Sequence, residues 1–202
     1  MNEESEKERA KSIEWEAIQD IDSATYTCAY CGQTVSSNQG IIVNDRYNGK
    51  KGGIFMCSLC KFPTYLGPDF NGNNIQSPNA KYGNSVSDVP DSVNHIYEEM
   101  RSSYSVGAYT GTILLARTLL NHIGVNFGAK ENQGFQYYVE YLFNNGYLPQ
   151  NSKDWVDKIR EFGNKATHRL VVNTKKDAQL MIKFCEMILK INYEYNAVIK
   201  DE

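Results

Sequence analysis

The sequence lacks the features that mark membrane and secreted proteins. No stretch approaches the roughly 18 uncharged apolar residues of a spanning helix. The most apolar segment, residues 111–127, is interrupted by Arg117, Asn121 and His122. The charge-dense start of the chain, MNEESEKERAK, has no apolar core of a secretory signal. We therefore expect a soluble protein of the reducing cytoplasm, without a membrane partner.

An excess of positive charge is also missing. The formal net charge of −3 argues against a protein coated in basic patches for duplex DNA. It leaves room for a local nucleic-acid site, because binding depends on how charge is distributed. The sequence has no glycine-rich phosphate loop after a strand, no Ser–His–Asp order and no open metal site. An enzyme built on one of those sites, or on a small-molecule cofactor, is thus the poorest expectation.

Cysteine is scarce, yet four of the five cysteines form two Cys-x-x-Cys pairs. Cys28 and Cys31 are the first pair, Cys57 and Cys60 the second, with twenty-five residues between them. Such a pair turns tightly enough to aim two thiolates at one tetrahedral centre, and two pairs complete four ligands at about 2.3 Å. The pattern predicts one structural Zn²⁺ per chain, in a closed site with no position for catalysis.

Two other interpretations of these cysteines are weaker. A pair of disulfides conflicts with the reducing compartment. A redox Cys-x-x-Cys would need a strand–CxxC–helix context, and two such pairs argue against it. The surrounding residues alternate and are β-branched or aromatic, so we expect short strands in a small β zinc ribbon over residues 23–66. Cys185 stands alone at an apolar helix position and is expected in a core.

The pattern of the remaining sequence predicts a helical bundle. A charged segment or short helix occupies residues 1–22, and a linker rich in Gly, Asn, Ser and Pro covers residues 67–88. Helical periodicity dominates residues 89–202. The expected helices cover residues 90–104, 108–123, 133–144, 154–169 and 174–198, the first opened by Pro90 and the last by a Thr174–Asp177 capping box. The predicted fold class is mainly α: an antiparallel bundle of about five helices behind the β ribbon.

The fourth of these helices, DWVDKIREFGNKATHR, carries the most unusual surface. Its apolar residues share one face, and Arg160, Asn164 and His168 recur at i, i+4 and i+8 on a stripe about 150° away. In one interpretation this stripe cleaves or binds RNA, together with Arg117 from a neighbouring helix. The histidine would move a proton and an arginine would hold the phosphate. In the other, Asn164 and His168 only brace the helix end.

Two stretches carry a family resemblance. They are VPDSVNHIYEEMRSSYSVGAYTGTILLARTLLNHIG and LFNNGYLPQNSKDWVDKIREFGNKATH. With their Pro-led helix, A–R–x–x–L helix and Gly-Asn-x-x-x-His ending, they strongly resemble the bacterial family catalogued as domain of unknown function 4145. The resemblance covers roughly residues 89–199. Members of that family often carry an N-terminal zinc ribbon.

The family looks like part of the wider HEPN group of helical bundles. Many HEPN proteins are metal-independent ribonucleases, often dimeric, in toxin and antiphage systems, and others are non-catalytic. The HEPN signature places a His four to six residues after an Arg. Arg117 and His122 fit that spacing, whereas seven residues separate Arg160 from His168.

Two functional hypotheses follow. In the first, the protein is a homodimeric, HEPN-like ribonuclease or RNA-binding protein of bacterial defence or stress. Its tentative catalytic residues are then Arg117, Arg160, Asn164 and His168. In the second, it is a non-catalytic interaction and dimerisation module whose zinc ribbon contacts a partner or nucleic acid.

Overall fold

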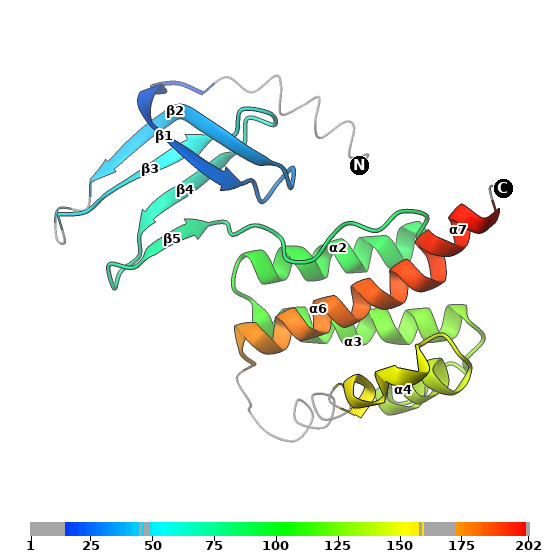
Figure 1. Ribbon diagram of the computed structural model, residues 1–202. Coiled ribbons are helices and arrows are strands. Elements are labelled where there is room, and N and C mark those ends of the chain that lie inside the picture. The colour runs from blue at the N-terminus through cyan, green and yellow to red at the C-terminus, as the bar shows by residue number, and fades with distance from the viewer. Residues whose placement is uncertain (1–14, 45, 47–48, 158, 160–172, 201–202) are drawn as a thin grey trace. The chain divides into compact units, whose positions relative to one another are not determined.

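The computed structural model describes residues 15–44, 46, 49–157, 159 and 173–200 (Figure 1). The chain divides into two compact units, which we call the sheet unit, Met1–Lys81, and the helical unit, Tyr82–Glu202. Each unit has a hydrophobic core of its own.

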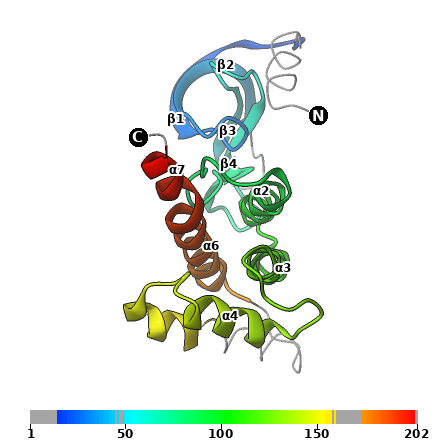
Figure 2. The ribbon, with the colours of Figure 1, turned by 90° about the vertical axis from the view of Figure 1, so that its right-hand side faces the viewer.

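The sheet unit is built on an antiparallel meander of five strands, paired in chain order. The strands are β1 (Gln19–Thr27), β2 (Thr34–Asn44), β3 (Lys51–Met56), β4 (Pro63–Pro68) and β5 (Asn74–Ser77). The sheet curls strongly (Figure 2), and glycine at position 40 permits a close approach within it. A Cβ atom there would lie 2.2 Å from the carbonyl oxygen of Ile54.

The core of the sheet unit is small. Along β2, Val35 and Ser37 are buried while the residues that alternate with them face solvent. The buried cluster consists of Tyr26, Val35 and Phe55 together with three cysteines. So few apolar side chains stabilise a domain only weakly, and domains of this kind commonly depend on a metal or a disulfide.

The helical unit is a bundle around one central helix. The helices are α2 (Asp91–Ser105), α3 (Tyr109–Asn126), α4 (Phe135–Asn144), α6 (Lys175–Leu189) and α7 (Tyr195–Lys200), with a 3-10 turn at Gln150–Ser152 and helical residues 153–157. Helix α3 contacts α2, α4 and α6 (Figure 1). Its residues Ile113, Leu119 and Ile123 are fully buried, as a nearly all-round apolar helix requires.

The predicted helix boundaries are largely confirmed. Pro90 precedes the first residue of α2, and Gly107, at φ +81°, separates α2 from α3. The Thr174–Asp177 capping box is present in full at the start of α6. The predicted fifth helix, however, is not one continuous α-helix, because a π-helical turn, Lys190–Glu194, separates α6 from α7. Most of the predicted helix over 154–169 lies outside the described residues.

The prediction of a mainly α protein is wrong. The sheet runs from Gln19 to Ser77, so it extends on both sides of the small ribbon expected over residues 23–66. Strand β1 begins inside the predicted N-terminal segment 1–22, and β5 lies inside the predicted linker 67–88. Both are edge strands with mostly exposed side chains, so neither shows the apolar alternation that identifies a strand. The boundary between the two units along the chain lies between Lys81 and Tyr82, which is also within residues 67–88.

Within the described part of the chain, every helix is too short or too polar to span a bilayer.

Candidate metal centre

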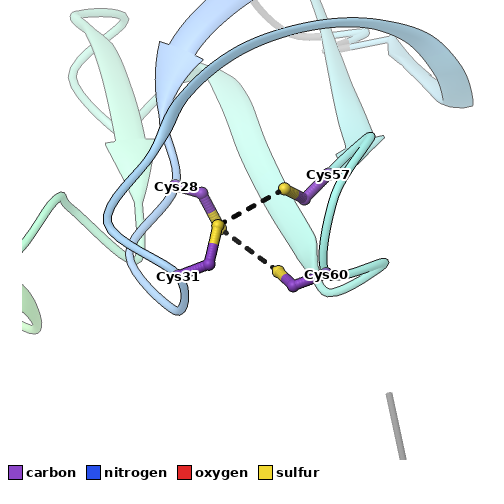
Figure 3. Close-up of side chains that lie close together, drawn as sticks. All are labelled: Cys28, Cys31, Cys57 and Cys60. Carbon is purple, nitrogen blue, oxygen red and sulfur yellow. Dashed lines mark hydrogen bonds between the residues drawn. The ribbon is translucent and has the colours of Figure 1, made fainter. Parts of the chain in front are cut away.

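Two similar turns carry the four paired cysteines. In the first, after β1, the N–H of Cys28 donates to the Gln33 carbonyl at 2.9 Å, and the N–H of Gly32 donates to the Cys28 carbonyl at 3.0 Å. Gly32 has φ +71°. These bonds fold the chain back so that the side chains of Cys28 and Cys31 leave the turn on the same side (Figure 3).

The second turn, after β3, repeats this pattern. The N–H of Cys57 donates to the Phe62 carbonyl, and the N–H of Lys61 donates to the Cys57 carbonyl, both at 3.0 Å. Lys61 occupies the position of the glycine and has φ +63°. A non-glycine residue in this left-handed region is strained, and it is kept here because the turn requires it.

The four sulfur atoms converge on one point between the two turns. The Sγ atoms of Cys28 and Cys60 lie 3.7 Å apart, those of Cys31 and Cys57 lie 3.8 Å apart, and all four are within 4.8 Å of one another (Figure 3). A disulfide would bring two sulfurs to about 2.05 Å. A tetrahedral ion with bonds of about 2.3 Å instead requires sulfurs about 3.8 Å apart. The arrangement therefore fits a four-thiolate metal site.

Burial and local hydrogen bonds shift the pKa values of these thiols in different directions. Cys28 and Cys57 have no exposed surface, and Cys60 is 8% exposed. Burial raises the pKa of Cys28 and of Cys60. At Cys57 burial also disfavours the thiolate, but hydrogen bonds from the N–H groups of Cys60 and Leu59 outweigh it and lower the pKa. Four thiolates this close together would repel one another, and a bound cation would offset that repulsion, so the donor set is compatible with a metal site.

Exposed aromatic and apolar side chains surround the two turns. The Tyr30 ring, 47% exposed, stacks on Phe62 with centroids 4.6 Å apart and planes inclined by 20°. Leu59 is 57% exposed, and the indole N–H of Trp15 donates to the Lys61 carbonyl at 3.1 Å. We call Trp15, Tyr30, Leu59, Lys61 and Phe62 the knuckle face.

The predicted catalytic residues are only partly described. Arg160, Asn164 and His168 lie outside the described residues. Arg117, on α3, is half-buried, and its guanidinium carbon lies 4.9 Å from the centroid of the Phe135 ring at the start of α4. His122 is exposed on the same helix. Five positions turn a helix by about 140°, so Arg117 and His122 do not share a face.

Clustered tyrosines of the helical unit pack internally. The hydroxyls of Tyr141 and Tyr147 both donate to the Phe127 carbonyl, at 2.9 and 3.3 Å. The Tyr147 ring also stacks on Phe127 at 4.2 Å. These side chains close the end of α3, which favours packing over an external contact surface.

A buried polar cluster in the helical unit was not predicted. Arg101, 6% exposed, donates to the carbonyls of Tyr82 at 3.1 Å and Gly83 at 2.7 Å. Glu186, 5% exposed, accepts from both the backbone and side-chain nitrogens of Asn84. Together they pin the segment that enters α2. The sequence did contain a signal for this cluster, because Arg101 and Glu186 each interrupt the apolar stripe of a helix. A charged side chain in such a stripe is buried only when it is paired.

Comparison with known proteins gives one match. The family model described as Domain of unknown function (DUF4145) matches residues 98–201, just over half of the chain. No curated protein and no solved structure matches.

Proposed function

The chain belongs to the family described as domain of unknown function 4145, and on this premise we propose that it is an RNA-binding protein whose sheet unit is stabilised by one Zn²⁺. The observation that carries the proposal is the convergence of four thiols beside the exposed Tyr30–Phe62 stack. The contact surface is the knuckle face. Because the family looks like part of the HEPN group, we further propose a role in cytoplasmic bacterial defence or stress responses.

Zinc is the metal that best suits four converging thiolates. It is soft enough for sulfur, accepts a tetrahedral site without preference from its d electrons, and is not redox-active. Cys28, Cys31, Cys57 and Cys60 would hold it and leave no open position for a substrate. The ion would cross-link the turn after β1 to the turn after β3, and thereby fix the knuckle face.

The knuckle face has the chemistry of a single-strand platform. An unpaired base can stack on an exposed aromatic ring, whereas a base in a duplex is already stacked. The ring of Tyr30 is held in place by Phe62, so little conformational freedom is lost on binding. Lys61, which precedes Phe62 in the chain, is exposed, and its ammonium group can contact a phosphate.

The test is binding of labelled single-stranded RNA, followed by fluorescence anisotropy with the zinc-loaded protein. Loss of one stacking contact weakens binding by about 1–3 kcal/mol, so Tyr30→Ala should bind at least several-fold more weakly. Tyr195→Ala is the matched control, because Tyr195 is an exposed tyrosine of the helical unit. Equal binding by the two variants, or tighter binding of duplex RNA, would overturn the proposal.

The ribonuclease hypothesis needs a separate experiment. A labelled RNA pool is incubated in EDTA with the protein and with His168→Ala. Cleavage that leaves 2′,3′-cyclic phosphate ends and is lost in the variant would establish catalysis through His168. RNA that stays intact with both proteins would favour binding without catalysis. Light scattering of the same samples tests the homodimer.

A further inference from the structure

A groove of about 380 Å³ runs along α6 in the helical unit. Lys176, Gln179, Leu180 and Lys183 line it at i, i+3, i+4 and i+7, with Asp177 beside them. This spacing places them on one stripe of the helix, with the two lysines about 10 Å apart along its axis. Tyr82 and Trp155, from two other segments, complete the lining.

The two aromatic rings of the groove are held by packing behind them. The Trp155 indole stacks on the fully buried Phe184 ring, with centroids 5.9 Å apart and planes inclined by 22°. It is nevertheless 36% exposed. Tyr82 packs against Tyr104 at 5.3 Å. Rings fixed in this way can receive a planar ligand without loss of side-chain freedom.

The charge of the groove is positive. Lys176 makes no hydrogen bond or ion pair with any residue that the structure describes. The Asp177 carboxylate, by contrast, accepts from the backbone nitrogen of Thr174 at 2.9 Å and from its hydroxyl at 2.6 Å. Its charge is therefore used at the start of α6, where the helix dipole favours it.

Lys183 also retains positive character. Its ammonium lies 2.9 Å from Glu186, but Glu186 is shared with Lys190 at 3.4 Å. One carboxylate thus faces two ammonium groups. The Lys183 side chain is 41% exposed, and its nitrogen lies 5.6 Å from the centroid of the Tyr82 ring. A cation and a π face are therefore adjacent at this end of the groove.

We propose that this groove binds a nucleoside phosphate, with the base against Trp155 and Tyr82 and the phosphate on Lys176 and Lys183. A simple anion would use the lysines but not the rings, and an apolar ligand would use the rings but not the lysines. A nucleotide uses both. The ligand is either a free mononucleotide or the end of an RNA strand, which share this chemistry. The groove belongs to the helical unit, whereas the knuckle face belongs to the sheet unit.

The intrinsic fluorescence of the chain permits a direct test. The protein has two tryptophans, so Trp15→Phe leaves Trp155 as the only indole. Titration with AMP or UMP should quench its emission saturably, because a base stacks on the ring. Adenosine and inorganic phosphate each carry half of the ligand, and each should bind at least about tenfold more weakly.

Two neighbouring lysines supply the variant and its control. Lys176→Ala should weaken AMP binding by about tenfold through loss of a charge-assisted contact. Lys175→Ala removes the same charge one position away, outside the groove lining, and should leave binding unchanged. Equal weakening by both, or no saturable quenching with any nucleotide, would overturn the proposal.

Two further measurements identify the source of the ligand and separate the two sites. A 5′-phosphorylated pentanucleotide that binds at least tenfold more tightly than AMP supports an RNA end, and comparable binding supports a free nucleotide. Tyr30→Ala should not alter the AMP titration. The knuckle-face proposal can therefore fail while this one stands, and the reverse also holds.

Discussion

At the scale of single residues, the two cysteine turns require the same left-handed backbone conformation but use different residues for it. Gly32 and Lys61 both have positive φ, +71° and +63°. The left-handed conformation costs an L-residue roughly 1–2 kcal/mol, whereas glycine adopts it freely. Lys61→Gly should therefore stabilise the zinc-loaded sheet unit by about 1 kcal/mol. The bond from the Trp15 indole is retained, because its acceptor is the main-chain carbonyl of residue 61.

Urea unfolding monitored by Trp15 fluorescence, in a variant that keeps Trp15 as its single tryptophan, measures this change. The matched control is Lys61→Ala, which removes the ammonium group but keeps the Cβ atom, and it should stay within about 0.5 kcal/mol of the parent protein. If both variants shifted the midpoint equally, the lysine side chain rather than the backbone would be the cause.

The same scale shows which parts of the sites could be predicted from the sequence. The spacing of Cys28 and Cys31 is a local property, so their common direction follows from the tight turn alone. The nucleotide groove joins Tyr82 to Trp155, which are far apart in the sequence and meet only through packing of the bundle. No periodicity within one segment could have indicated that groove.

At the scale of elements, helices were predictable and edge strands were not. The core face of α2 and the capping box of α6 each depend on residues three or four positions apart, so they can be recognised in the sequence. Strand β5 has four residues, none of them buried, and is defined by its pairing with β4. Such a strand depends on its neighbour rather than on its own sequence.

Helix α6 gives a prediction that depends on pH. Burial disfavours the charged form of Glu186, but the hydrogen bonds from Lys183 and Asn84 outweigh it, so its pKa lies below the ordinary 4.5. A lowered pKa means that this carboxylate stabilises the fold above about pH 4.5, and that the contribution is lost as pH falls through the folded-state pKa. Glu186→Gln should cost about 1–3 kcal/mol at pH 7.

Thermal unfolding of the parent protein and Glu186→Gln from pH 7 to pH 3 measures the effect. The gap between the two midpoints should close below about pH 4.5, once the parent carboxylate is protonated. Glu99→Gln, at an exposed position of α2, serves as the surface control. A Glu186→Gln gap that stays constant over this range would mean that the lost hydrogen bonds, and not the charge, are responsible.

At the scale of the whole molecule, the two units derive their stability from different sources. The helical unit buries residues such as Leu119, Leu120 and Phe184 completely. In the described part of the sheet unit, half of the buried cluster is cysteine. A core of that size leaves little margin without a metal, since binding to a folded thiolate set contributes directly to folding free energy.

Removal of zinc should therefore unfold one unit and spare the other. Trp15 contacts the second cysteine turn and Trp155 stacks on Phe184, so single-tryptophan variants report on the two units separately. A strong zinc chelator should shift the emission of Trp15 to that of a solvated indole, and leave Trp155 emission and helical circular dichroism unchanged.

Acid should release the metal in the same way, because protons compete for the thiolates. Added Zn²⁺ should restore the Trp15 signal. Parallel changes at both tryptophans would show that the units unfold together, and an unchanged Trp15 would show that the sheet unit folds without the ion.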